Sequence, residues 1–351
     1  RAAARTYTVA FNKTGDVGGH IKITNDDKVD VDCDLTREIM PQSGLALMPP
    51  SPVPETKARA DHDLPSAAAV DLAGTGKPEV EPLIKSLSHP ESEVRRRAAW
   101  TLGEIRDRRA VEALAKALQD RDGFVRDAAS EALSKTGQGA VDALLAALDS
   151  QEADVRIAAL RALGRIADPR AAERLAAFVE ERDPAVGRWA IWALGKIKDR
   201  RGVPALMDAL QDEDPRTQQF AAWALGETGE PAVGALIAAL GAERAETRDG
   251  AVHALGVIGQ PAAAPLIAGL KDGNGFVRAN AAQALGIIGW SDAVPALLPL
   301  MKDENSLVRS RAAGALGKVA GAGVVEPLLA ALQDADPEVR RCAAEGLGRA
   351  K

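Results

Sequence analysis

A twelve-residue pattern that recurs every 30 or 31 residues constrains this chain more than any other feature. In one copy, from Val155 to Ile166, it reads Val-Arg-Ile-Ala-Ala-Leu-Arg-Ala-Leu-Gly-Arg-Ile. The leucine of its Leu-Gly pair, or the equivalent residue, occurs at positions 102, 133, 163, 194, 225, 255, 285, 316 and 347. A period this regular indicates a tandem array in which each unit buries its apolar face against its neighbours. We therefore expect one elongated stack in place of a globular core.

Each repeat has the pattern of two helices separated by a polar turn. In Ala110 to Leu118 the apolar residues at 111, 114, 115 and 118 form a helical stripe, which predicts the first helix. Polar breaks such as Glu181 to Pro184 follow, and their Asp-Pro pair is the expected N-cap and first position of the second helix. The second helix is rich in alanine, which lets neighbouring helices approach closely.

This pattern resembles the HEAT-like repeats of the phycobilisome-lyase (PBS lyase) type. The resemblance covers residues 77–351 and is carried by segments such as Val94–Ile105, Val155–Ile166 and Asp336–Gly348. It implies an all-α fold, a right-handed α-solenoid of about nine HEAT-like helix pairs. Members of this family include tetrapyrrole lyases, a hydroxylase and plain scaffolds, so the resemblance predicts the fold more closely than the function.

The first 76 residues have a different character. Residues 1–40 are predicted to form a small β-rich segment, with alternating stretches at 5–12, 20–24 and 29–35 that indicate an antiparallel meander. Residues 41–62 are a proline-rich linker, with four prolines among residues 49–54. We place the solenoid at residues 63–351, with 63–76 as a degenerate half-repeat that caps its N-terminal end. Because the chain begins at Arg1 without a Met, we interpret it as processed or excised.

The variable positions of the second helix indicate where a partner would bind. With the valine counted as position 0, positions 0, 4, 7, 8 and 11 are small or apolar and are predicted to face the stack. Positions 2, 3, 6 and 10 vary, and we expect them to line a concave surface. At positions 3 and 6 of two adjacent repeats stand Trp189, Trp192, Phe220 and Trp223. We predict an exposed aromatic patch there, with packing inside a bend of the solenoid as the alternative.

Charged residues beside this patch complete the predicted site. The predicted partner-binding residues are Trp100, Arg161, Arg188, Trp189, Trp192, Phe220, Trp223, Glu227 and His253. An aromatic centre with a polar rim suits a helix or an extended segment of another protein, lying in the concave groove. In the same two repeats Gly187 and Gln218 replace the arginine found at position 1 of seven other copies. We interpret that arginine as a structural ladder to neighbouring turns, with ligand binding as the alternative.

Catalytic, metal and cofactor sites have little support in the sequence. The four histidines, His20, His62, His89 and His253, lack metal-ligand spacing, and none is followed by the glutamate that the hydroxylase branch of the resembling family uses. We therefore expect no catalytic residues, no metal and no cofactor. His253 with Asp249 is interpreted as a solvated helix pair in preference to an acid–base pair. A net charge of -6 without a Lys/Arg block argues against nucleic acid. No stretch approaches the ~18 apolar residues of a transmembrane helix.

Two functions remain open from the sequence. The first is a non-enzymatic interaction or scaffold module, compatible with a place in a larger assembly. The alternative is a bilin-lyase-like or tetrapyrrole-handling protein. In that alternative the aromatic patch stacks on the tetrapyrrole while Arg161, Arg165 or Arg188 pairs with its propionates.

Overall fold

The computed structural model describes residues 21–23, 29–31, 80–319 and 322–349. The chain divides into two compact units, which we describe separately. The central unit is Met48–Pro265, and the terminal unit combines Arg1–Leu47 with Leu266–Lys351. The predicted strand at 5–12, the linker at 41–62 and the cap at 63–76 lie outside the described residues.

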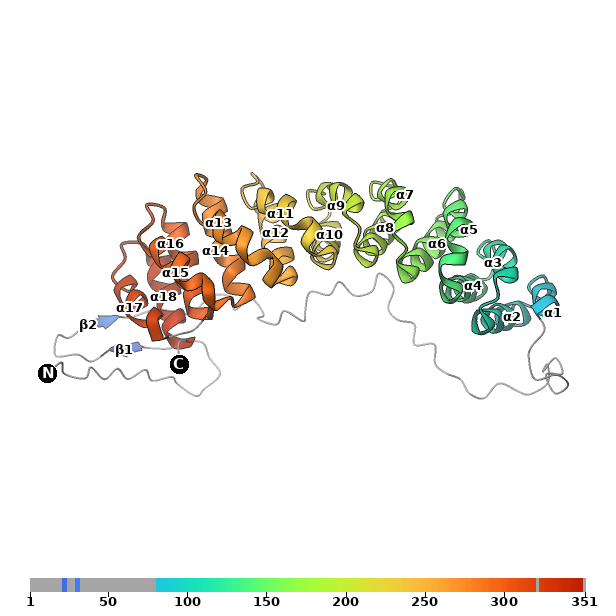
Figure 1. The fold of residues 1–351 in the computed structure, drawn as a ribbon, viewed down its shortest axis with the longest axis horizontal. Coiled ribbons are helices and arrows are strands. Elements are labelled where there is room, and N and C mark those ends of the chain that lie inside the picture. The colour runs from blue at the N-terminus through green and yellow to red at the C-terminus, as the bar shows by residue number, and fades with distance from the viewer. Residues whose placement is uncertain (1–20, 24–28, 32–79, 320–321, 350–351) are drawn as a thin grey trace. The chain divides into compact units, whose positions relative to one another are not determined.

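The central unit is a stack of helix pairs, each with a short first helix and a long second helix (Figure 1). The short helices are α1 (Val80–Ser86), α3 (Val111–Ala117), α5 (Val141–Ala147), α7 (Ala172–Ala176), α9 (Val203–Ala209) and α11 (Val233–Ala239). The long helices are α2 (Ser92–Ile105), α4 (Gly123–Thr136), α6 (Ala153–Ile166), α8 (Pro184–Ile197), α10 (Pro215–Thr228) and α12 (Ala245–Ile258). The short helices follow one edge of this unit and the long helices the other.

Single turns of 3-10 helix lead into most of the short helices. In the central unit they are η1 (Arg108–Ala110), η2 (Gly137–Ala140), η3 (Pro169–Ala171), η4 (Arg200–Gly202), η5 (Glu230–Ala232) and η6 (Gln260–Ala262). In three of them an aspartate caps the turn: Asp107, Asp168 and Asp199 each accept a hydrogen bond from the backbone N–H two residues later. These three aspartates lie where the chain turns back after α2, α6 and α8.

The terminal unit repeats the same arrangement, and the division between the units falls inside α13. Its elements are α13 (Ala263–Gly269), α14 (Gly275–Ile288), η7 (Ser291–Ala293), α15 (Val294–Leu297), η8 (Leu298–Lys302), α16 (Ser306–Val319), η9 (Ala322–Val324), α17 (Val325–Ala331) and α18 (Pro337–Arg349). Strands β1 (Ile21–Ile23) and β2 (Val29–Val31) pair antiparallel, with Ile21 opposite Val31. These two short strands do not test the predicted β-rich segment as a whole, which stays a prediction.

The polar breaks start the long helices as the sequence predicts. Asp183 accepts a hydrogen bond from the Ala185 N–H, and Pro184 occupies the first turn of α8. Asp214 caps α10 in the same way, ahead of Pro215. Such caps stabilise a helix by about 1 kcal/mol each, because they satisfy backbone donors that have no partner inside the helix.

The core of each unit lies between its short and long helices. The leucine of the Leu-Gly pair is fully buried in the first three copies, at Leu102, Leu133 and Leu163. The predicted all-α stack of HEAT-like helix pairs is confirmed over residues 80–319 and 322–349.

Candidate functional site

The inner long helices of the central unit, α4, α6, α8 and α10, are buried on three sides, against their own short helices and against the long helices before and after them. The glycine at position 9 marks the closest approach. A Cβ on Gly195 would lie 2.9 Å from Ala224 Cα, and one on Gly103 would lie 2.8 Å from Ala132 Cα. Both alanines stand at position 7 of the next long helix. A glycine–alanine pair therefore sets the spacing between neighbouring repeats.

Position 3 belongs to the same buried side as position 7. The two positions are one helical turn apart. A Cβ on Gly250, at position 3 of α12, would lie 2.7 Å from Leu210 Cδ1 in the preceding repeat. Ala158, at position 3 of α6, is buried as well. Of the variable positions, 2, 6 and 10 thus carry most of the exposed surface of the long-helix face.

Three of the four predicted patch residues are buried between repeats. The exposed fractions are 4% for Trp189, 6% for Phe220 and 6% for Trp223. The prediction of an exposed four-ring patch is therefore wrong. Trp189 and Phe220 stand at position 3, which faces the preceding repeat. Trp223 lies across Gly195, whose added Cβ would come within 3.1 Å of Trp223 Cζ3.

Trp192 is half-buried and takes part in the same packing. Its ring meets that of Trp189 edge to face, with centroids 5.2 Å apart and an interplanar angle of 81°. It also covers Gly164, where a Cβ would collide with the indole. Lys196 places its Nζ 5.0 Å from the centroid of the Trp223 ring, a cation–π contact. These rings fill space between layers, which was the alternative interpretation of the sequence.

Trp100 is the predicted site residue that the fold leaves exposed. Its exposed fraction is 58%, at position 6 of α2. A cavity of about 270 Å³ lies at the first turn of α2 and the start of α4, lined by Ser92, Glu93, Arg96, Asp122 and Phe124. Trp100 follows Arg96 by four residues and so shares its helix face. Phe124, at the start of α4, is 70% exposed. We call Arg96, Trp100 and Phe124 the α2–α4 surface.

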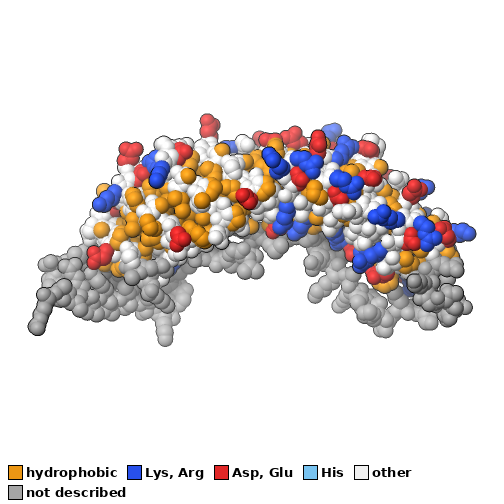
Figure 2. All heavy atoms as spheres, viewed as in Figure 1, with side chains coloured by type: hydrophobic (Ala, Val, Ile, Leu, Met, Phe, Trp, Pro, Cys, Tyr) orange, Lys and Arg blue, Asp and Glu red, His pale blue; other side chains and the backbone are white. Residues whose placement is uncertain are grey.

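The charged residues of the predicted rim form ion pairs at the surface of the stack. Their pairs, each between neighbouring repeats, are Arg161–Asp127, Arg165–Glu131, Arg188–Asp214 (3.4 Å) and Lys198–Glu227 (3.2 Å). Figure 2 shows acidic and basic side chains interleaved over α2 to α6. Exposed pairs of this kind stabilise a fold by about 0–1 kcal/mol each. The rim charges therefore already form ion pairs between neighbouring repeats of this chain.

His253 is half-buried on α12, and this burial lowers the pKa of its imidazole because the charged form loses hydration. Asp249, one turn earlier, is exposed. Within the described ranges, no group of three or more His, Cys, Asp or Glu side chains is placed to hold a metal ion.

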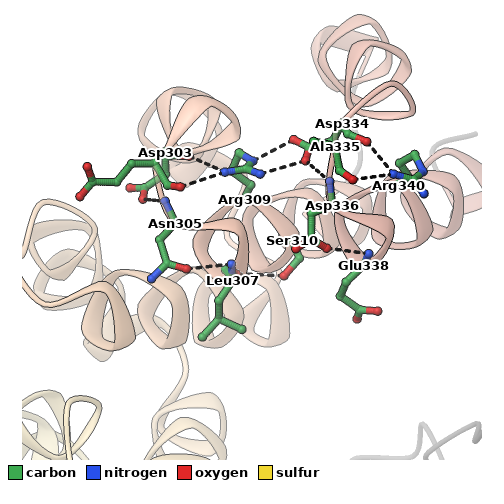
Figure 3. Close-up of polar contacts among 11 residues, drawn as sticks. Asp303, Asn305, Leu307, Arg309, Ser310, Asp334, Ala335, Asp336, Glu338 and Arg340 are labelled. Atoms are coloured by element: carbon green, nitrogen blue, oxygen red, sulfur yellow. Dashed lines mark hydrogen bonds and ion pairs between the residues drawn. The ribbon is translucent and has the colours of Figure 1, made fainter.

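The position-1 arginines form the ladder that the sequence predicts. All seven donate from Nη1 to the carbonyl oxygen six residues earlier, in the turn that precedes their helix. Arg309 shows the full arrangement in Figure 3: it binds the Asp303 carbonyl oxygen at 2.9 Å and, through Nε and Nη2, the Asp334 carboxylate at 2.8 and 2.9 Å. Asp334 lies in the next turn. The arginine therefore joins consecutive turns, and the structural interpretation is confirmed.

The two exceptions to the ladder have local structural causes. Gln218 donates from Nε2 to the Asp212 carbonyl oxygen at 2.6 Å, so it keeps the contact to the residue six positions earlier. At Gly187 a Cβ would lie 2.7 Å from the Val179 carbonyl oxygen, which leaves no room for a side chain. Neither exception needs a partner to explain it.

A second cavity, in the terminal unit, was missed from the sequence. Its volume is about 230 Å³, and helices α14, α16 and α18 line it. Gly314, at position 6 of α16, stands in its wall, and a Cβ there would meet nothing within 4 Å. The available signal was a glycine at a position where most other copies carry a large side chain.

Comparison with known proteins identifies the repeat. A sequence profile of HEAT repeats matches residues 80–150, 141–216, 203–285 and 263–348. The chain is a HEAT-repeat protein. No curated protein matches this HEAT-repeat protein. Within its described part, no single helix is long and apolar enough to cross a membrane, and the consecutive helices Ala245–Ile258 and Gln260–Gly269 reach that length and composition only as a broken pair.

Several solved structures are similar to this HEAT-repeat protein. An engineered protein is 24% identical over 78% of this chain and 89% of its own, with a TM-score of 0.35. Human deoxyhypusine hydroxylase is 26% identical over 71% and 98%, with a TM-score of 0.30. The karyopherin Kap121p bound to Nup53p is 16% identical over 77% of this chain, with a TM-score of 0.48. This chain covers 37% of the karyopherin chain.

Proposed function

We propose that this HEAT-repeat protein is a non-enzymatic binding module that holds a helix or an extended segment of another protein on its long-helix face. The observation that carries the proposal is the exposed indole of Trp100. In a fold whose other large side chains mostly fill the spaces between repeats, this ring faces solvent. Tryptophan and arginine are the residues that most often dominate binding energy at protein interfaces, and Arg96 lies one turn away.

The α2–α4 surface has the form of an anchoring site. Its cavity of about 270 Å³ is of the size of a large side chain, and its wall includes the exposed ring of Phe124. Arg96 is held at the cavity by Glu93, at 2.7 Å. An apolar side chain of the partner would enter this cavity beside Phe124, with polar contacts at its edge. From the predicted set, Arg161, Arg188, Trp192, Glu227 and His253 continue the face through their exposed parts.

Capture of a partner from the native source tests this proposal. Trp100→Ala is expected to reduce the amount of co-purifying protein about tenfold or more, because loss of an interface tryptophan costs about 2 kcal/mol or more. The control is Lys116→Ala, which truncates an exposed side chain on the short helix α3, away from the long-helix face. Equal capture by the two variants, with unchanged thermal unfolding, would contradict the proposal.

Tetrapyrrole handling is not proposed as a second function. That function required an exposed aromatic patch on which the tetrapyrrole could stack. Three residues of the predicted patch, Trp189, Phe220 and Trp223, are buried. The PBS lyase subtype of the repeat and a place in a larger assembly stay predictions.

A further inference from the structure

The cavity in the terminal unit is lined by more positive than negative side chains. Its charged lining residues are Arg311, Lys318, Glu338, Arg341, Glu345 and Arg349. Four cations therefore meet two carboxylates in a space of about 230 Å³. An excess of one sign inside a cavity raises the local concentration of ions of the opposite sign.

One arginine already takes both carboxylates. Arg341 donates from Nε to Glu338 at 2.9 Å, and its guanidinium also pairs with Glu345. The hydrogen bond from Arg341 is the main cause of the lowered pKa of Glu338. Arg311, Lys318 and Arg349 are left without an ion pair to any carboxylate of the described chain.

The unpaired cations distinguish this cavity from the long-helix face of the central unit. There the cations at position 10 have partners: Lys135 binds Glu104 at 2.8 Å, Arg165 pairs with Glu131, and Lys196 lies over the Trp223 ring. At the cavity, Lys318 has an exposed side chain, and partial loss of hydration followed by the charges of Arg349 and Arg311 lowers its pKa, against the smaller opposing effect of Glu345. A bound anion would offset both effects.

A hydrogen-bond acceptor without a donor lies beside the cations. The side-chain Oε1 of Gln283, in α14, is buried and has no hydrogen-bond partner. Buried polar groups are nearly always hydrogen-bonded, so an orphan acceptor in a cavity wall indicates a missing donor. Gly314 keeps the space open, because a larger side chain would extend into it.

We propose that this cavity binds an acidic side chain of a protein segment, with the carboxylate between Arg311, Lys318 and Arg349 and a backbone N–H of the segment toward Gln283. A peptide supplies the carboxylate and the N–H donor together, and guanidinium groups match a carboxylate in shape and charge. The proposal rests on the proposed function only in that the ligand is a protein segment. It needs nothing from the α2–α4 surface.

Binding of a fluorescein-labelled hexaglutamate peptide to the full chain, followed by fluorescence anisotropy, tests the site. Arg311→Gln with Lys318→Gln is expected to weaken binding about tenfold or more, since each lost charge-assisted hydrogen bond is a strong one. The matched control is Lys271→Gln with Lys302→Gln, which removes two exposed charges of the same unit away from the cavity. Gly314→Leu, which fills the cavity without changing charge, is expected to weaken binding as well.

A thiol in the cavity wall gives a second readout. Cys342 lines the space, and burial, together with the charge of Glu338, raises its pKa to about 11. In a Cys33→Ser background, hexaglutamate is expected to slow alkylation of Cys342 by iodoacetamide. The protection should persist in the Lys271→Gln/Lys302→Gln control and be lost in Arg311→Gln/Lys318→Gln.

Three results would overturn the proposal. Equal weakening by the two double variants would show non-specific attraction to positive charge. Equal binding of hexaglutamine would show that the carboxylate is not needed for binding. Displacement of hexaglutamate by equimolar inorganic phosphate would show a site for free oxyanions. None of these results bears on partner capture through Trp100, so the two proposals fail separately.

Discussion

Small residues decide how closely neighbouring long helices approach, and large ones decide what fills the space that remains. Gly195 lets the helix that carries Ala224 come within contact distance, and Trp223 then closes over the same glycine. The effect of a substitution therefore depends on its position in the repeat more than on its chemistry. Gly195 and Gly234 allow a direct comparison, because both lie in helices of the central unit and only Gly195 is in close contact with a neighbouring helix.

Replacing Gly195 with alanine is expected to destabilise the protein by about 1–3 kcal/mol, because the new methyl would overlap Ala224 and force the helices apart. Gly234→Ala places a methyl where nothing lies within 4 Å and is expected to stabilise by about 0.5–1 kcal/mol through helix propensity. Urea unfolding of both variants measures the difference. A Gly195→Ala variant as stable as the original protein, or more stable, would show that close approach does not limit position 9.

Trp223→Ala and Trp100→Ala compare how much a buried and an exposed tryptophan contribute to stability. Trp223 is 6% exposed, and its loss is expected to cost about 3–5 kcal/mol because a cavity opens between repeats. Trp100 is 58% exposed, and its loss is expected to change stability by about 0.5 kcal/mol or less. Thermal unfolding of the two variants decides the point. If the Trp223→Ala protein were as stable as the original, the Trp223 ring would not be needed for packing and would again be a candidate for partner binding.

At the scale of the element, the turns between helices are tied together by arginine. Each position-1 arginine reaches back to the turn before its own helix, and Arg95, Arg278 and Arg309 also bind a carboxylate in the following turn. These guanidinium groups are largely buried between turns, which strengthens the contacts relative to exposed pairs. Where both contacts are made, the arginine holds its own helix pair against the next one.

A double-mutant cycle on Arg309→Gln and Asp334→Asn measures this tie. The expected coupling energy is about 1–2 kcal/mol, because the contact is bidentate and partly buried. The same cycle on Lys135→Gln and Glu104→Gln, an exposed pair at 2.8 Å, is expected to give about 0.5 kcal/mol or less. Coupling energies of equal size would indicate that the ladder contributes no more than a surface ion pair.

At the scale of the whole molecule, aspartates that bind arginine make folding dependent on pH. Hydrogen bonds from the Arg201 side chain and its backbone N–H lower the pKa of Asp199 to about 2. Contacts with arginine also lower the pKa of Asp120, Asp168 and Asp334. Because these carboxylates bind protons more weakly in the folded chain than in the unfolded one, their contribution is complete above about pH 4. It is lost as the pH falls toward 2.

The thermal midpoint is therefore expected to fall between pH 4 and pH 2. Asp199→Asn should lower the midpoint at pH 5 and lose less than the original protein on acidification, so that the two curves converge. Parallel curves for the two proteins would show that Asp199 keeps the same pKa when the chain unfolds.

The sequence predicts the parts of this fold that depend on local, repeated signals. The period follows from comparing the copies, and the helix pairs, the Asp-Pro starts of α8, α10 and α18 and the position-1 arginines are each visible in short stretches of sequence. The sequence analysis treats each long helix as having one buried face, with position 3 outside it. In the structure α8 and α10 are buried on three sides, so Trp189 and Phe220 at position 3 are buried as well. The cavity beside Gly314 depends on what neighbouring helices leave empty. Trp100 was identified correctly as a variable, ring-bearing position, and its role in binding stays a prediction.

Site-directed photo-crosslinking in the native source tests the central claim most directly. With p-benzoylphenylalanine in place of Trp100 or Gln219, on the long-helix face, the protein is expected to form crosslinks to one common partner. With the same group at Glu112 or Ala238, exposed on the short helices, it should form none. Crosslinks to the same partner from the short-helix positions, without any from position 100, would contradict the account.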